Sequence, residues 1–187
     1  GVQPLQVQST LSVYLMAFAW MSLFHGAVSD SFGRRRVILV TQTVYAITAI
    51  GCVFAPGFGM LLLLRFVQGM AAGAGMIVGR AVIRDRFDSR RAQTFMAEVT
   101  VVSSFAPALA PILGGWLHTW FGWRGPFVFL GLLGTAVLVV WYLGMPGSLP
   151  ISARQRFHPV VLTRNYWRVL RSPPFLALCV ATSLGGG

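Results

Sequence analysis

Residues 26–36 read Gly-Ala-Val-Ser-Asp-Ser-Phe-Gly-Arg-Arg-Arg and lie between two long apolar segments. Gly26 leaves room for a neighbouring helix, and Gly33 suits a tight turn because glycine adopts conformations that other residues resist. Asp30 stands where the first segment ends, beside the arginines at 34–36, so we expect its carboxylate to be ionised and paired. An incidental aspartate in a basic loop is the plainer alternative, and the spacing of glycine, aspartate and glycine argues against it.

Outward from this loop, five apolar segments are long enough to cross a bilayer, which takes about 20 residues of helix. They lie at about 10–29, 37–55, 59–82, 94–117 and 125–145, and a sixth begins near Pro173. The joints between them are short, so neighbouring helices are expected to be antiparallel. The sequence therefore predicts an all-α membrane protein.

Composition agrees with the membrane class. The chain is 56% hydrophobic and only 10% charged, which is too little charge for a soluble domain of this size. Its net charge of +11 could indicate a nucleic-acid-binding protein. The arginines, however, punctuate apolar runs and do not gather on one folded surface, so we expect a lipid bilayer as partner and no nucleic acid.

The arginines also predict the orientation. Most of them lie in alternate loops, namely at 34–36, at 84, 86, 90 and 91, and at 154, 156, 164, 168 and 171. Basic loops stay on the cytoplasmic side, so the first span runs inward and we expect a further helix upstream. Residues 1–145 are expected to form an N-terminal transmembrane bundle, 146–172 a basic cytoplasmic linker, and 173–187 the start of a second bundle.

The 59–82 segment carries Arg65 at membrane depth, followed by Gln68 and Gly69. An arginine there is costly and usually faces the bundle interior or water. The alternative is that Arg65 extends to the near interface. Glycine pairs four residues apart, at 69/73 and 75/79, predict faces for close helix packing, and we favour an inward-facing Arg65.

The 94–117 segment carries Pro107 and Pro111, then Gly114 and Gly115. Each proline removes a backbone hydrogen bond and bends the helix on the same face. The two glycines would then offer a smooth surface to a partner helix, although proline and glycine are also common in ordinary membrane helices.

Enzyme and metal chemistry find little support. His25, His118 and His158 stand apart at span ends or in the linker, and the two cysteines have no metal-ligand spacing. We therefore expect neither an enzyme nor a metal site.

The three motifs together resemble those of the major facilitator superfamily. The loop at 26–36 is similar to its signature G-x-x-x-D-[RK]-x-G-R-[RK], with Ser31 in place of the basic residue. Residues 65–69 resemble R-x-x-Q-G, and residues 110–115 resemble the antiporter signature G-P-x-x-G-G, with Ala110 for the first glycine. The particular residues at these motif positions look like those of the bicyclomycin and chloramphenicol resistance (Bcr/CflA) branch of the superfamily. The resemblance implies twelve helices in two bundles, of which this chain would supply helices two to six and the start of seven.

The resemblance also implies roles for the motif residues. The cytoplasmic gating motif would comprise Gly26, Asp30, Gly33, Arg34 and Arg35, and we expect Asp85 to pair with one of the arginines at 34–36, a solvated charge cluster being the alternative. Proton coupling or the substrate cavity would involve Arg65, Gln68, Gly69 and Met76, with Tyr14 and Met16 as weaker candidates. The antiporter motif would be Pro107, Pro111, Gly114 and Gly115.

The function that follows is proton-coupled efflux of drugs or other small lipophilic molecules across the bacterial inner membrane, by alternating access. It would use the proton motive force and no cofactor. Its partners would be a drug-like substrate, protons and the C-terminal half of the same protein, and the coupling carboxylate is expected on the upstream helix. A proton-coupled importer of a small metabolite is the alternative.

Overall fold

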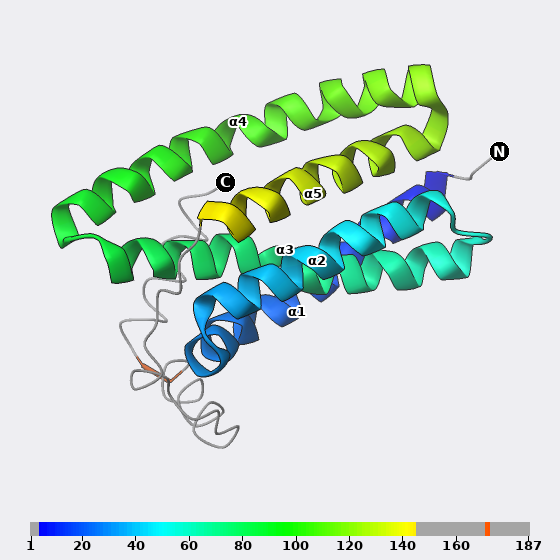
Figure 1. The fold of residues 1–187 in the computed structure, drawn as a ribbon. Helices are drawn as coiled ribbons and strands as arrows, with labels where there is room; N and C mark the ends of the chain where they lie inside the picture. The colour runs from blue at the N-terminus through cyan, green and yellow to red at the C-terminus, as the bar shows by residue number, and fades with distance from the viewer. Residues whose placement is uncertain (1–3, 145–170, 173–187) are drawn as a thin grey trace. The chain divides into compact units, whose positions relative to one another are not determined.

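The computed structural model describes residues 4–144 and 171–172 of the chain. It contains five α-helices, α1 (Pro4–Phe32), α2 (Arg34–Val53), α3 (Phe58–Arg86), α4 (Ser89–Phe121) and α5 (Gly125–Gly144), and a 3-10 turn, η1 (Gly122–Arg124) (Figure 1). Each of the five predicted spans falls within one of these helices or overlaps it closely. The predicted linker and the segment after Pro173 lie outside the described residues.

The helices have the length and hydropathy of membrane spans. By these two criteria the described residues contain four candidate spans, Gln8–Phe32, Arg34–Val53, Phe58–Arg86 and Ser89–Gly144. The last candidate contains α4, η1 and α5 and is 56 residues long, more than twice what one crossing requires. The all-α membrane fold predicted from the sequence is confirmed.

Two glycines shape the connections by adopting positive φ. Gly33, with φ 92°, is the only residue between α1 and α2. Gly122, with φ 68°, ends α4. These conformations are strained for residues with a Cβ atom, so the tight turn predicted at Gly33 is confirmed.

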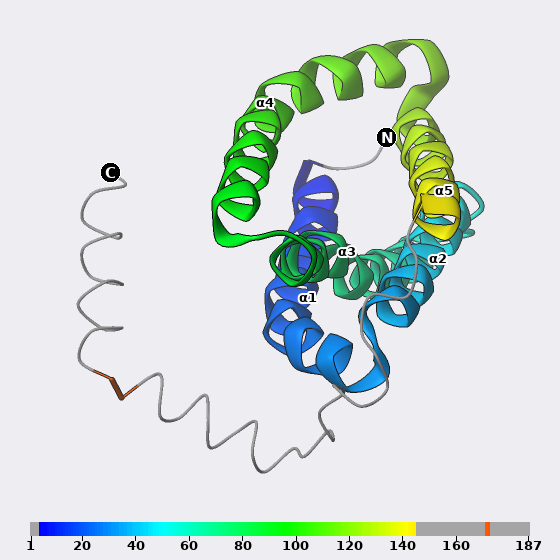
Figure 2. The same ribbon diagram turned by 60° about the vertical axis from the view of Figure 1, so that its left-hand side comes forward.

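The tightest helix contact is between α1 and α3, which run side by side (Figures 1 and 2). A Cβ atom on Gly69 would overlap the carbonyl oxygen of Tyr14, and one on Gly73 would lie 2.7 Å from the Ser22 hydroxyl oxygen. The absence of side chains on Gly69 and Gly73 therefore permits this approach. We call the contact of these two glycines with residues 14–25 of α1 the α1–α3 seam.

Helix α2 packs against both α3 and α5. A Cβ atom on Gly131 of α5 would lie 2.8 Å from Ile50 of α2, so this contact also depends on a glycine. Within it, the Gln42 side-chain amide donates a hydrogen bond to the Gly134 carbonyl oxygen at 3.0 Å. A polar bond of this kind holds two membrane helices together at low dielectric.

Helix α4 is packed far less closely than the others. It meets the bundle mainly at its two ends and curves away between them (Figure 2). Pro107 and Pro111 both lie inside it, consistent with the bending expected from proline. Within the described part of the chain, Ala92 is the only buried residue of α4.

The glycines that were predicted to pack against other helices differ in what the structure places beside them. Gly69 and Gly73 pack as expected. For Gly75, Gly114 and Gly115, no atom of another described helix lies within 4 Å of where their Cβ atoms would be, so close packing at these three glycines stays a prediction. Gly79 meets only Trp141, at 4.0 Å.

Candidate functional site

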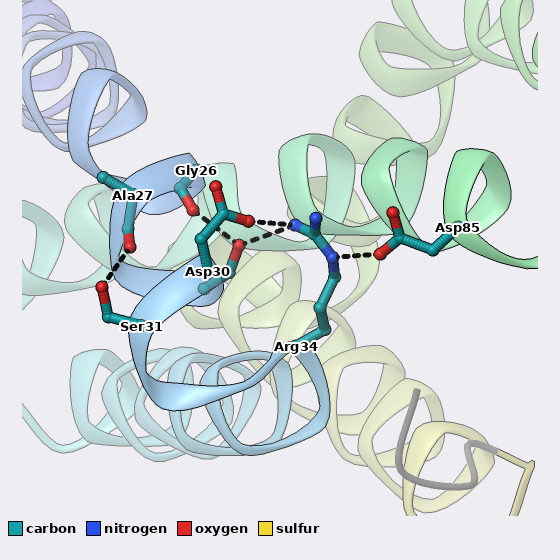
Figure 3. Close-up of polar contacts among 7 residues, drawn as sticks. Gly26, Ala27, Asp30, Ser31, Arg34 and Asp85 are labelled. Carbon is teal, nitrogen blue, oxygen red and sulfur yellow. Dashed lines mark hydrogen bonds and ion pairs between the residues drawn. The ribbon is translucent and has the colours of Figure 1, made fainter. Parts of the chain in front are cut away.

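Arg34 forms a charged cluster at the end of the bundle where α1 ends and α2 begins (Figure 3). Its guanidinium contacts the Asp30 carboxylate at 2.9 Å and the Asp85 carboxylate at 2.6 Å. It also donates a hydrogen bond to the Ser29 hydroxyl oxygen at 3.0 Å, and Ser29 donates to the Gly26 carbonyl oxygen at 2.8 Å. We call these five residues the Arg34 cluster.

The Arg34 cluster ties three helices together. Gly26, Ser29 and Asp30 belong to α1, Arg34 begins α2, and Asp85 lies in the last turn of α3. The Arg34 side chain is only 11% exposed. A cation this well covered depends on its carboxylates more than a surface pair does, because removing one partner leaves a poorly solvated charge.

The sequence predicted that Asp85 pairs with one of the arginines at 34–36, and the structure identifies the partner as Arg34. Arg35 points elsewhere and donates a hydrogen bond to the Tyr142 carbonyl oxygen in α5 at 3.0 Å. Ser31, which stands where the family signature has a basic residue, bonds within its own helix to the Ala27 carbonyl. Gating by this cluster remains a prediction.

Arg65 lies between the aromatic rings of two other helices. Its guanidinium carbon is 4.3 Å from the centre of the Tyr14 ring in α1 and 5.8 Å from the centre of the Phe127 ring in α5. Stacking on aromatic faces stabilises a guanidinium through cation–π attraction. The contacts with α1 and α5 show that Arg65 faces its neighbouring helices, as the inward-facing prediction required.

The polar partners of Arg65 are few. One terminal nitrogen donates to the Gln68 side-chain oxygen at 2.8 Å. The Arg65 Nε and the Gln68 side-chain nitrogen are buried and have no hydrogen-bond partner among residues 4–144. No carboxylate of the described chain forms an ion pair with Arg65, so the guanidinium retains capacity for an acceptor.

Of the other predicted cavity residues, Tyr14 lies against the Arg65 guanidinium, and no such contact is seen for Gly69, Met16 or Met76. Gly69 is buried in the α1–α3 seam, where it admits the Tyr14 backbone and leaves no room for a ligand. Met16 and Met76 are exposed. Tyr14, a weaker candidate, is the one that contacts the guanidinium.

The antiporter-motif residues lie apart on α4. Pro107, Pro111 and Gly115 are exposed, and the described residues leave their surroundings open. Farther along α4, toward its junction with α5, an apolar cavity of about 290 Å³ is lined by Leu113, Trp116, Leu117, Trp120, Phe121 and Phe129. This cavity could not be predicted from the sequence, because nothing in the sequence marks which apolar residues of two separate helices will meet.

One titratable residue, His25, lies in a different setting from the one that the sequence suggested. His25, set aside as isolated at a span end, is only 1% exposed and faces Gly73 in the α1–α3 seam. The histidine was missed because an apolar segment does not reveal which of its faces is covered. In the part of the chain described, no three histidine, cysteine or acidic side chains group as metal ligands.

Comparison with known proteins gives consistent results. A profile described as Major Facilitator Superfamily matches residues 1–187. The chain is 31% identical over 186 residues to a bicyclomycin resistance protein homolog of Haemophilus influenzae, covering 100% of this chain and 47% of that protein. It is 31% identical over 147 residues to multidrug resistance protein D of Escherichia coli K12, covering 79% and 37%.

A solved structure shares the fold. The crystal structure of the human organic anion transporter MFSD10 (TETRAN) matches 78% of this chain and 33% of that one, with a TM-score of 0.65. The sequence identity is 23%, so the similarity concerns the fold alone. The chain spans about half the length of the Haemophilus relative and about a third of the Escherichia coli one.

Proposed function

Because the chain belongs to the major facilitator superfamily, a family of multi-pass membrane transporters, we propose that it forms part of a bacterial inner-membrane exporter. The exporter would exchange protons for drugs or other small lipophilic molecules, driven by the proton motive force and without a cofactor. The bundle in this chain would rock against a second bundle of the same protein, around a site between them.

The observation that carries the proposal is the setting of Arg65. The guanidinium rests on the rings of Tyr14 and Phe127, which accommodate its charge but accept few of its hydrogen bonds. It has no carboxylate partner within residues 4–144. Such a cation stabilises the ionised form of a carboxylate brought beside it from another helix.

Proton coupling would follow from that pairing. A proton that binds the carboxylate cancels its charge, and its attraction to Arg65 falls. Substrate binding and proton binding would then favour different arrangements of the helices around Arg65, which is what exchange requires. The Arg34 cluster would hold the cytoplasmic end closed in one of these arrangements.

Export is favoured over uptake by two considerations. The relatives named above are a bicyclomycin resistance protein homolog and a multidrug resistance protein, both names that refer to drug resistance. The Pro107-to-Gly115 pattern in α4 is also similar to the antiporter signature. The alternative, proton-coupled uptake of a metabolite, shares the same Arg65 chemistry and differs in direction.

The test uses the full-length transporter in everted membrane vesicles, with radiolabelled chloramphenicol and ethidium as probes. We expect an imposed gradient, acid inside, to drive probe into the vesicles, and an ionophore that collapses the gradient to abolish the uptake. Replacing Arg65 by Gln should lower the rate by at least about tenfold, the factor that corresponds to about 1.4 kcal/mol.

The matched control is Arg91→Gln, since the Arg91 side chain is 77% exposed and its ion pair is with Asp88, at 3.9 Å. Its rate should stay within about twofold of wild type, less than 0.5 kcal/mol. A stable Arg65→Gln protein with an unchanged rate would refute the role of Arg65. Accumulation in right-side-out vesicles under an inward proton gradient would establish the importer.

A further inference from the structure

The side of α1 that faces α3 carries a polar stripe made of Ser22, His25 and Ser29. Their spacing places them on one face of the helix. The position of a Cβ atom on Gly73 would be 2.7 Å from the Ser22 hydroxyl oxygen and 3.5 Å from His25 Nδ1, so both side chains border the same point of α3. His25 and Ser29 are buried.

Two members of this stripe lack hydrogen bonds. The Ser22 hydroxyl and both ring nitrogens of His25 are buried, with no partner in hydrogen-bond geometry anywhere in the described bundle. The backbone of Met21, one turn earlier, lies near enough to interact with the imidazole. A buried polar group without a partner destabilises the folded state, so the seam would be more stable with an apolar residue here.

The space around the pair limits what can bind. The two helices approach so closely at Gly73 that even one added carbon atom would crowd the Ser22 hydroxyl. A metal ion would need several ligands, and the pair offers at most a hydroxyl and an imidazole. A proton needs no additional volume, and histidine takes up a proton near neutral pH more readily than any other ordinary side chain.

The stripe continues into the Arg34 cluster. Ser29 lies one turn beyond His25, accepts a hydrogen bond from Arg34 and donates one to the carbonyl of Gly26, which directly follows His25. A displacement of α1 at His25 therefore moves two members of the cluster. The Arg34 contact with Asp85 joins this end of α1 to α3.

The charged groups around the closed seam disfavour a positive charge on His25. Titratable and charged groups on α1 and on the two helices packed against it are Tyr14 and Asp30 on α1, Arg34, Arg35, Arg36, Tyr45 and Cys52 on α2, and Arg65, Arg80, Arg84, Asp85 and Arg86 on α3. Cations outnumber carboxylates in this set, and both carboxylates already contact Arg34. Residues 69–77 of α3, around Gly73, contain no titratable side chain.

We propose that His25, together with Ser22, is a proton-binding site inside the α1–α3 seam, and that protonation there loosens the Arg34 cluster. An imidazolium carries two N–H donors and a charge, and in the closed seam neither ring nitrogen of His25 has a hydrogen-bond partner among the described residues. Separation of the helices admits water to solvate the charge. Low pH therefore favours an open seam, whichever residue couples protons to transport.

The first test measures protonation directly. Histidine labelled with ¹³C is followed by NMR between pH 5 and 9 in the full-length transporter in lipid nanodiscs, and the resonance missing from His25→Asn is assigned to His25. We expect this resonance to shift with pH across that range. A His25 resonance that does not move overturns the proposal.

The second test measures opening of the seam. Ala17 is buried in α1, and its Cβ lies 3.1 Å from where a Cβ atom on Gly69 would be, so a cysteine at position 17 should react with a maleimide only when the seam opens. Cys52 and Cys179 are first replaced by alanine, and rates are divided by those of an exposed control, Gln93→Cys, to remove the intrinsic pH dependence of the thiol. We expect the normalised rate to rise on the order of tenfold from pH 8 to pH 5.

His25→Asn should abolish this rise, and Ser22→Ala should reduce it, whereas His118→Asn, exposed near the far end of α4, should leave it intact. His25→Gln provides a second variant should the asparagine protein not fold. A wild-type rate that is flat with pH overturns the proposal without any variant, as does a rise that persists in His25→Asn. Neither test measures transport, so a failure of proton-coupled efflux would be seen separately.

Discussion

The α1–α3 seam and helix α4 carry similar sequence features and use them differently. Both contain closely spaced glycines. In the seam, a Cβ atom on Gly69 or Gly73 would meet the backbone or side chains of α1, while Gly114 and Gly115 on α4 have no described neighbour within 4 Å. A glycine in a membrane helix therefore indicates close packing only where a partner helix is present.

The largest difference is expected from alanine at these glycines. Gly69→Ala should destabilise the protein by about 2–3 kcal/mol, because the new Cβ would overlap the Tyr14 carbonyl, which cannot move without shifting α1. Gly115→Ala should stabilise it by up to about 1 kcal/mol through helix propensity. Thermal unfolding of the detergent-solubilised full-length protein measures both.

If Gly115→Ala proves as damaging as Gly69→Ala, a helix beyond the described residues covers that face of α4, and the contrast between the two regions disappears.

The second comparison uses two aspartates. Asp85→Asn should cost about 2 kcal/mol, because it removes a carboxylate from Arg34, whose side chain is 11% exposed. Asp88→Asn should cost at most about 0.5 kcal/mol, since its pair with Arg91 spans 3.9 Å and both side chains are more than two-thirds exposed. The same unfolding measurement, repeated at high salt, should leave the Asp85 effect largely unchanged. Equal effects at the two positions would mean that the Arg34 cluster acts as an ordinary surface network.

The smallest effect is expected from a single interhelical hydrogen bond. Gln42→Leu removes the bond to the Gly134 carbonyl and should cost about 0.6 kcal/mol, the average for such bonds in membranes, and at most about 1.7 kcal/mol. Thr119→Val on α4 loses only bonds to its own helix and should stay within about 0.5 kcal/mol of wild type. A larger loss for Thr119→Val would again point to an unseen partner of α4.

The sequence predicted the helices well because membrane spans are long and continuous, and the bilayer sets their length. The turn at Gly33 and the Arg34–Asp85 pair were also predictable. The first needs only local backbone sterics, and the second only that two charged helix ends lie on the same side of the membrane.

The features that could not be predicted depend on how the helices are rotated against one another. Nothing in residues 10–29 distinguishes the face that meets α3 from the face that meets lipid, because both are apolar. His25 was therefore set aside, and Tyr14 was named only as a weaker cavity candidate, with no contact to Arg65 predicted. On α4, Gly114 and Gly115 suggested a packing face that the described residues do not provide.

The single-residue joint at Gly33 has a mechanical consequence. Helix α1 ends at Phe32 and α2 begins at Arg34, so no slack separates them. The two helices meet at a sharp turn. Its geometry is fixed by the positive φ angle of Gly33 and by the hydrogen bond from the Gly33 amide to the Ser29 carbonyl. A tilt of α1 would therefore tilt α2 as well. Through the Gln42–Gly134 hydrogen bond, the movement would also reach α5.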